Sequence, residues 1–151
     1  MSTKYEGSEQ EHRALDLYIK LMRAADAVNA RVNNHLSTAT LSVSQFGALE
    51  TLYHLGPLEQ GEIGAKILRS SGNLSLVIDS LATRGLVVRQ RDPEDRRRII
   101  IHLTEAGRQV IDNLFPPHVA NIVQEMAVLS PEEQEQMAAL CRRVGRQDTG
   151  K

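Results

Sequence analysis

The stretch from Ser70 to Thr104 constrains this chain more than any other part of the sequence. It reads SSGNLSLVIDSLATRGLVVRQRDPEDRRRIIIHLT, a helical pattern followed by two strand-like runs. Valines and isoleucines favour strands at 87–91 and 98–103. The Asp-Pro-Glu-Asp run between them favours a turn, because Pro93 presets φ and the aspartates bond nearby backbone. The sequence therefore predicts a β-hairpin that directly follows a helix.

Another short helix is predicted just before this one, over Glu59–Leu68. Ser70 or Ser71 is expected to cap the following helix, which runs to Arg84 and ends at Gly85 in a left-handed conformation. Helix, short turn, helix and hairpin are the order of a winged helix-turn-helix. In that geometry the second helix enters the DNA major groove by its N-terminal end.

The candidate major-groove residues lie at the start of this second helix. Short hydrogen-bonding side chains there can reach phosphates or base edges, and a helix N-terminus attracts phosphate. An apolar side chain on the same outer face can touch a thymine methyl group. These predicted DNA-binding residues are Ser70, Ser71, Asn73, Ser75 and Leu76. Taken alone, an ordinary helix cap with a solvated face would also explain them.

The hairpin and its flanks are dense in arginine and contain no lysine between Arg84 and Arg108. The planar guanidinium group suits phosphate recognition and the narrow minor groove. The predicted DNA-binding residues here are Arg84, Arg96 and Arg97, with Asp95 placed to hold a guanidinium group. The alternative is an exposed hairpin laced by salt bridges. Its position directly after a helix-turn-helix favours DNA binding.

Helical patterns on both sides of this region predict a mostly α-helical protein with a small β-hairpin wing, an α+β fold. A long helix is expected from Glu11 to about Leu36, with one apolar stripe. A capping box at Ser42 opens the next helix. After the hairpin, Thr104 and Ser130 are expected to cap two further helices.

The apolar stripes near the two ends of the chain exceed what one small lobe can cover, and exposed stripes of that size mark interfaces. They comprise Leu15, Tyr18, Met22, Ala25, Val32 and Leu36 near the N-terminus, and Met137, Leu140, Cys141 and Val144 near the C-terminus. A two-fold homodimer would read an inverted repeat, with half-sites about one helical turn apart. Pro116-Pro117 is expected to kink or break the helix that follows the hairpin.

The segment DPEDRRRIIIHLTEAG, preceded by SLATRGLVVRQR, resembles the wing of the multiple-antibiotic-resistance regulator (MarR) family. The similarity covers nearly the whole chain in helix order and is tightest from Leu41 to Gly107. It implies one domain over 1–151. Helices at about 11–38 and 108–146 would form the dimerisation region, and about 41–105 the winged helix-turn-helix lobe.

The resemblance also implies residue roles. The aspartate and the second arginine of the family's wing motif fall on Asp95 and Arg97. Arg97 is thus expected to enter the minor groove, with Asp95 orienting it and Arg96 supporting it. Gly64 departs from the family pattern, which usually has alanine there, and so does the double proline.

The function implied by the resemblance is a sequence-specific double-stranded DNA-binding regulator. It would be a repressor relieved by a small lipophilic or phenolic effector, without another cofactor. An enzyme is not expected, because the sequence lacks a nucleophile elbow, a glycine-rich phosphate loop and paired Cys/His arrangements. The alternative is a non-catalytic interaction module whose basic wing binds an acidic protein.

Composition sets the remaining expectations. The net charge is −1, so a DNA-binding prediction rests on local clustering of charge. A cytoplasmic protein without a membrane partner is expected, because the N-terminus is polar and no apolar run could span a bilayer. The scattered histidines do not predict a metal site. Cys141 lies on an apolar stripe, where packing is favoured over a redox switch.

Overall fold

The computed structural model describes residues 4–67 and 73–146 of the chain. Helices dominate and the strands form one small antiparallel sheet, which confirms the predicted fold class. The chain divides into two compact units, Asn33–His118 and Met1–Val32 with Val119–Lys151.

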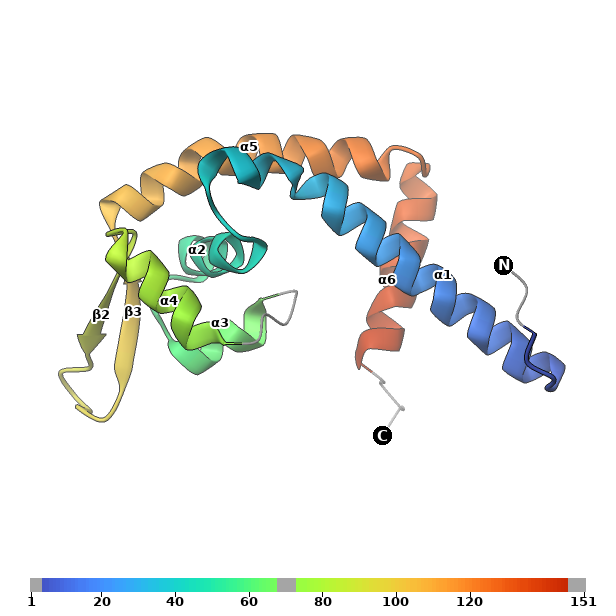
Figure 1. Ribbon diagram of the computed structural model, residues 1–151, viewed down its shortest axis with the longest axis horizontal. Helices are drawn as coiled ribbons and strands as arrows, with labels where there is room; N and C mark the ends of the chain where they lie inside the picture. Colours follow the sequence, from blue (N-terminus) through green and yellow to red (C-terminus); the bar gives the residue numbers. More distant parts are fainter. Residues whose placement is uncertain (1–3, 68–72, 147–151) are drawn as a thin grey trace. The chain divides into compact units, whose positions relative to one another are not determined.

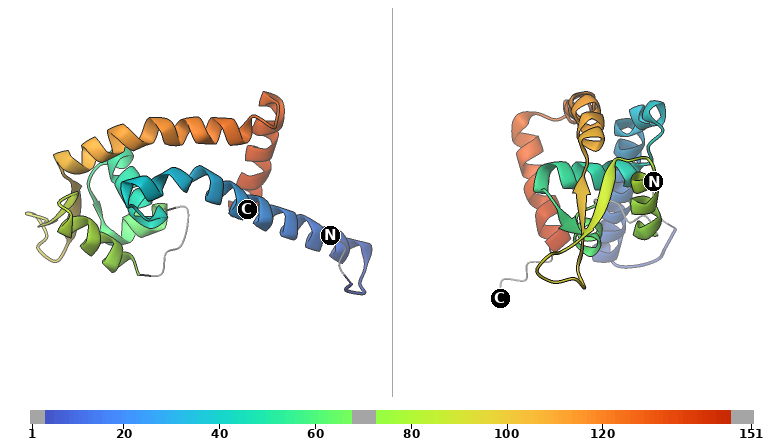
Figure 2. Two further views of the ribbon diagram at one scale, coloured as in Figure 1. Left: turned by 45° about the horizontal axis from the view of Figure 1, so that its top comes forward. Right: turned by 90° about the vertical axis from the view of Figure 1, so that its left-hand side faces the viewer.

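The Asn33–His118 unit, called the lobe below, contains the predicted winged helix-turn-helix. Its elements are η1 (Asn34–Ala39), α2 (Val43–Leu55), β1 (Leu58–Glu59), α3 (Gln60–Lys66), α4 (Leu74–Thr83), β2 (Val87–Arg91), β3 (Ile99–Leu103) and the first part of α5 (Glu105–Met126). The loop that joins β2 to β3 projects away from α2 (Figure 1), and the left view of Figure 2 shows the same arrangement.

The sheet has three strands in the order β1-β3-β2, one strand more than the predicted hairpin. Arg89 of β2 lies opposite Ile101 of β3, and Leu58 of β1 pairs with Ile101 on the other edge. The prediction assigned Glu59 to a helix and missed β1. A two-residue strand is too short to display the alternation by which strands are recognised.

The core of the lobe is built from apolar side chains that α2, α3, α4, β3 and α5 bring together. Those with almost no exposed surface are Leu49, Leu52, Ile63, Ile78, Leu81, Ile101 and Ile111. Each such side chain contributes about 1.5 to 3 kcal/mol by leaving water. This packing stabilises the short helix α3. Its own helix propensity is low because it contains Gly61 and Gly64. A Cβ at Gly64 would lie 3.0 Å from a methyl carbon of Leu74, so an alanine there would require a small shift of that side chain.

Helix α4 is joined to the sheet by a compact arrangement of backbone contacts. It ends in a Schellman motif, in which Gly85 has φ 72° and the Leu86 N–H donates to the Leu81 carbonyl at 2.9 Å. The Thr104 hydroxyl accepts from the Gly107 N–H at 3.1 Å and donates to the Gly85 carbonyl at 2.6 Å. A Cβ on Gly107 would lie 2.1 Å from the Leu86 carbonyl oxygen, so this approach requires glycine.

Pro116-Pro117 was predicted to kink or break helix α5; this helix runs from Glu105 to Met126 without interruption, so the predicted break is wrong. The prolines remove the donors for the carbonyls of Asp112 and Asn113. All four residues are exposed, where water can bond the carbonyls instead. Ile111 and His118 are buried on the other side of the helix and hold it in place.

The second unit contains α1 (Glu9–Val32), the rest of α5 and α6 (Pro131–Arg146). The first helix was expected to reach Leu36, but it ends at Val32 and the chain continues as η1. Within this unit, the Arg31 Nε atom donates to both carboxylate oxygens of Glu125, at 2.9 and 2.8 Å. Ser130 caps α6 as predicted, because its hydroxyl accepts from the Glu133 N–H at 3.2 Å.

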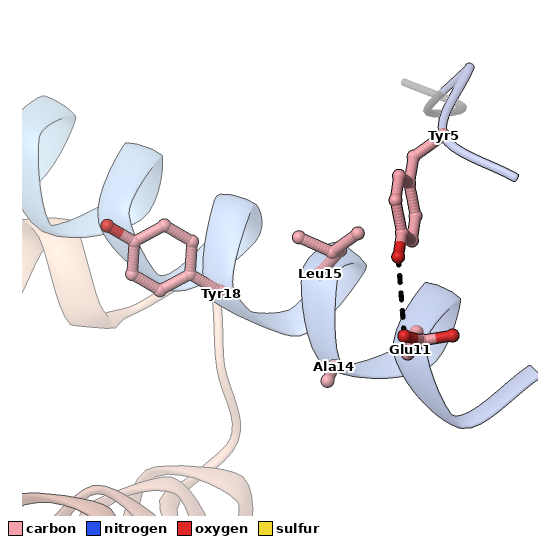
Figure 3. A pocket seen from close by; sticks show the side chains of 5 residues that line it. All are labelled: Tyr5, Glu11, Ala14, Leu15 and Tyr18. Atoms are coloured by element: carbon pink, nitrogen blue, oxygen red, sulfur yellow. Dashed lines mark hydrogen bonds between the residues drawn. The ribbon is translucent and has the colours of Figure 1, made fainter. Parts of the chain in front are cut away.

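Near the start of α1, the N-terminal segment folds back along the helix. The Tyr5 hydroxyl lies 3.3 Å from the Glu11 carboxylate beside an open hollow that Ala14, Leu15 and Tyr18 also line (Figure 3). The Ser8 N–H bonds the same carboxylate at 2.7 Å and lowers the pKa of Glu11. These contacts order the chain just before the helix.

Much of the apolar surface of this second unit is exposed in the single chain. The larger exposed apolar side chains are Tyr5, Leu17, Tyr18, Met22, Val119, Ile122, Val123, Val128, Met137, Leu140 and Val144. Cys141 is exposed among them rather than packed. None of the helices in the described ranges is both long and apolar enough to cross a membrane.

Candidate nucleic-acid interface

Helix α4 begins at Leu74, and its cap is Asn73 rather than a serine. The Asn73 Oδ1 atom accepts a hydrogen bond from the Leu76 N–H at 3.4 Å. The predicted serine cap is therefore wrong, because asparagine caps a helix as well as serine does and lies closer to this one. Ser70 and Ser71 lie outside the described residues.

The outer face of α4 combines polar and apolar side chains. Ser75 is exposed, and Leu76 is 63% exposed although it is a leucine. Asp79, one turn further along, forms a 2.6 Å ion pair with Arg89 of β2. Ser80 accepts a hydrogen bond from Gln45 of α2 at 2.9 Å, so it faces the lobe. The accessible start of α4 is therefore small, hydrogen-bonding and partly apolar.

The loop between β2 and β3, called the wing loop below, is closed by backbone hydrogen bonds. The Asp92 N–H donates to the Arg98 carbonyl, and the Arg98 N–H donates to the Asp95 carbonyl, both at 3.0 Å. The Asp92 carboxylate accepts from the Glu94 N–H at 2.9 Å. These contacts confirm the turn predicted from the aspartates and Pro93.

Asp95 and Arg97 form the most exposed charged contact of the wing loop. The Arg97 Nε and Nη2 atoms lie 3.1 and 3.2 Å from the two Asp95 carboxylate oxygens. The Arg97 backbone N–H also donates to Asp95, at 3.1 Å. These bonds from the Arg97 side chain and backbone lower the pKa of Asp95. The Arg97 side chain is 91% exposed, so it is oriented by Asp95 while remaining open to a partner.

Most other arginines of this region are engaged within the lobe. Arg89 pairs with Asp79, and the Arg91 Nη1 atom donates to the Arg96 carbonyl at 2.9 Å. The Arg108 guanidinium lies 5.5 Å from the centre of the Tyr53 ring. These three arginines therefore already have partners within the lobe.

Arg84 is among these internally bonded arginines, although it was predicted to contact DNA. Its Nη1 atom donates to the Thr40 carbonyl at 3.0 Å, and Nη2 lies 3.4 Å from the Ala39 carbonyl. Thr40 ends η1 with φ 54°, a rare conformation for a β-branched residue. The structure thus places Arg84 against η1 and not beside Asp95 and Arg97.

The side-chain contacts of Arg98 were not predicted from the sequence. Its Nε atom pairs with the Glu59 carboxylate, and Nη1 lies 3.4 Å from the Asp92 carboxylate. Glu59 and the neighbouring aspartate raise the pKa of Arg98, with Glu59 the larger cause. Glu59 lies far from the wing in the sequence, so spacing carried no signal for this pair.

A buried cluster of rings was also missed. His118 of α5 is 7% exposed, and its ring centre lies 4.7 Å from that of Phe46 and 5.3 Å from that of His35. Its Nδ1 atom is buried without a hydrogen bond among the described residues. Burial, and next the charge of His35, lower the pKa of His118. The histidines looked scattered because the fold, not the sequence, brings them together.

Comparison with known proteins agrees with this geometry. The MarR family profile matches residues 41–99. The HTH-type transcriptional regulator MhqR of Bacillus subtilis is 38% identical over 133 residues, covering 88% of this chain and 92% of that protein. The uncharacterized HTH-type transcriptional regulator YkoM of the same organism is 35% identical over 137 residues, covering 91% and 89%.

Among solved structures, Sco3205 from Streptomyces coelicolor is a MarR family transcriptional regulator in complex with DNA. It superposes with a TM-score of 0.81 at 22% identity, covering 95% of this chain and 91% of that one. This likeness concerns the fold.

Proposed function

We propose that this chain, which belongs to the MarR family of DNA-binding transcriptional regulators, is a repressor that binds an inverted-repeat operator as a homodimer. The observation that carries the proposal is Arg97, which is held by Asp95 at the wing loop and almost fully exposed. A guanidinium group oriented in this way loses little side-chain freedom when it enters a minor groove.

The accessible start of α4 supports a reading role in the major groove. Asn73 and Ser75 offer hydrogen-bonding groups, together with Ser70 and Ser71 before them. Leu76 offers an exposed apolar side chain that contact with a thymine methyl group would cover. In this proposal α4 supplies sequence specificity, and Arg96 and Arg97 supply charge and grip.

Ion pairs limit the electrostatic contribution of each wing, because Asp79 and Glu59 partly neutralise Arg89 and Arg98. If Arg96 and Arg97 are the groups that neutralise phosphates there, each wing releases about two counterions. A plot of the logarithm of affinity against the logarithm of salt concentration should then have a slope of about −0.9 for each phosphate contact. The contacts of both lobes add to this slope. The near-neutral net charge is consistent with this modest salt dependence.

The exposed apolar side chains of α1, α5 and α6 support the homodimer. Large exposed apolar side chains gathered along helices in this way are typical of a protein–protein interface. In a two-fold dimer the two α4 helices would meet half-sites about one turn of DNA apart. Such an operator is an inverted repeat.

Relief of repression by a small lipophilic or phenolic molecule rests on family membership. Small effectors are expected from the resemblance to the family, and this chain is 35% and 38% identical to two HTH-type transcriptional regulators over 91% and 88% of its length. The alternative, that this chain is a protein-interaction module with an acidic partner, is not favoured, because the relatives of this chain are transcriptional regulators. For the same reason this chain is not an enzyme.

The experiment that tests the proposal is selection of bound fragments from the source genome with the purified full chain. The enriched duplex should contain an inverted repeat, and gel-shift titrations at several salt concentrations should give a linear salt dependence. Adding phenolic acids to the complex then tests ligand relief. Enrichment of no sequence, or equal affinity for scrambled duplexes, would contradict the proposal.

A further inference from the structure

We propose that the ion pair between Glu59 and Arg98 fixes the wing to the helix-turn-helix, so that Arg98 serves DNA binding as a positioning residue without contacting DNA. The inference rests on the proposed function and adds to it. It divides the three consecutive arginines of the wing into two that face outward and one that faces the lobe.

The contacts of Arg98 distinguish it from its neighbour Arg97. The Arg98 backbone closes the wing loop through its carbonyl, bonded by Asp92, and its N–H, bonded to Asp95. Its side chain reaches the Asp92 and Glu59 carboxylates at once. The side chain is 48% exposed, against 91% for Arg97. Arg98 is therefore bonded to the loop and to the lobe.

Glu59 is placed where it can anchor the wing. It is the last residue of β1, and Gln60 begins α3, the first helix of the helix-turn-helix. Its N–H donates to the Glu62 carboxylate at 2.8 Å, which fixes it at the start of α3. The Glu59–Arg98 pair therefore links the element that positions α4 to the loop that carries Arg97.

The strand pairing alone attaches the wing weakly on this side. β1 pairs with β3 over two residues, Leu58 with Ile101 and Glu59 with Ile100. The ion pair extends the attachment past Ile99 to the base of the wing loop. Without it, the two β1–β3 pairs and the Asp79–Arg89 ion pair between α4 and β2 would remain. No ion pair among the described residues would then hold the base of the wing loop to α3, and Arg97 would sample more orientations relative to α4.

Neutralising Glu59 separates positioning from direct contact. If Arg98 contacted a phosphate, Glu59→Gln would free its guanidinium and remove a negative charge, so DNA binding would tighten. If Arg98 positions the wing, the same change weakens binding although the lobe becomes less acidic. The two interpretations therefore predict opposite signs.

The test uses gel-shift or anisotropy titrations of the full chain on its selected operator at one salt concentration. Glu59→Gln should weaken binding by roughly threefold to tenfold, the effect of a partly exposed ion pair present in both wings. Glu94→Gln, which neutralises an exposed acid of the same wing loop, is the matched control and should leave binding unchanged or slightly tighter. Unchanged or tighter binding by Glu59→Gln would overturn the inference.

A charge exchange guards against local unfolding of α3 in the single variant. Arg98→Glu alone should abolish tight binding, and Glu59→Arg combined with Arg98→Glu should recover most of it. A glutamate at a phosphate-contact position would repel DNA, so failure of the exchanged pair to recover binding in a folded dimer would also overturn the inference. If the unaltered chain bound no duplex, the proposed function itself would fail, and this inference with it.

Discussion

Single residues of the lobe act through close backbone contacts and through a few charged side chains. Gly107 shows the first kind, because the Leu86 carbonyl occupies the space of its missing side chain. Thr104 adds a neutral side-chain contact, since its one hydroxyl caps α5 and bonds the Gly85 carbonyl at the end of α4. The spacing of Gly85, Thr104 and Gly107 is therefore a packing requirement that places the wing beside α4.

The substitution Gly107→Ala should destabilise the lobe by about 2 to 3 kcal/mol, because its Cβ would overlap backbone that cannot move aside. Urea unfolding followed by circular dichroism measures the change. Gly61→Ala is the control: nothing lies within 4 Å of its Cβ, so stability should stay the same or rise by up to about 1 kcal/mol. Equal effects of the two variants would show that the Leu86 approach is not the constraint.

The substitution Arg97→Ala should weaken operator binding by about 1 to 3 kcal/mol while leaving the dimer and its thermal unfolding nearly unchanged. The Arg97 side chain bonds Asp95 and is 91% exposed, so its loss costs the fold little. A gel shift at fixed salt measures the binding. Arg13→Ala removes an equal charge from an exposed position of α1 and should have little effect. Unaltered binding by Arg97→Ala would mean that the wing assignment is wrong.

Contacts between near neighbours were predictable, whereas contacts between distant residues were not. Asp95 and Arg97 are two positions apart in a turn, so any tight turn brings them together. The bonds from Arg84 to Thr40 and from Arg98 to Glu59 depend on how the whole lobe packs. The sequence therefore indicated an arginine-rich surface but could not tell which arginines remain available.

Elements of the lobe follow their apolar patterns, and their ends follow local chemistry. The capping box at Ser42 and the turn at Gly85 were both recognisable from residue types. The end of α1 at Val32 was not, because the apolar stripe continues to Leu36 through η1. The continuity of α5 through two prolines depends on burial at Ile111 and His118, which only the fold supplies.

The packing of η1, α2 and α5 around His118 should make the lobe sensitive to acid. Burial, followed by His35, lowers the pKa of folded His118 below its ordinary value of about 6.5. As pH falls below about 6.5, the unfolded chain takes up a proton that the folded lobe resists. The free energy of unfolding should therefore be highest above that pH. It should decrease as the pH falls from about 6.5 toward the lowered pKa of folded His118.

Urea unfolding of the unaltered chain and of His118→Phe, measured between neutral and mildly acidic pH, checks this dependence. The variant keeps a ring beside Phe46 but cannot take up a proton, so its stability should decline less over the same range. If the free energy of unfolding had the same pH dependence in the unaltered chain and in His118→Phe, His118 would not be the source of the acid sensitivity.

On the scale of the whole molecule, the apolar side chains of the second unit carry the proposed association of two chains. Leu140→Asp should convert the dimer to monomers at micromolar concentration, because a charge buried in an apolar interface lacks a partner. Sedimentation velocity measures the change. Ala139→Asp places the same charge on the opposite face of α6 and should leave the dimer intact. A stable dimer of the Leu140 variant would remove α6 from the interface.

The sheet order also bears on how separate molecules behave in concentrated solution. β3 is paired on both sides, so the free strand edges of the described lobe belong to β1, two residues long, and β2. Short strands and charged edge residues, here Arg89 and Arg91 on β2, discourage another chain from adding a strand. Arg89 and Arg91 are therefore expected to disfavour edge-to-edge aggregation at this strand.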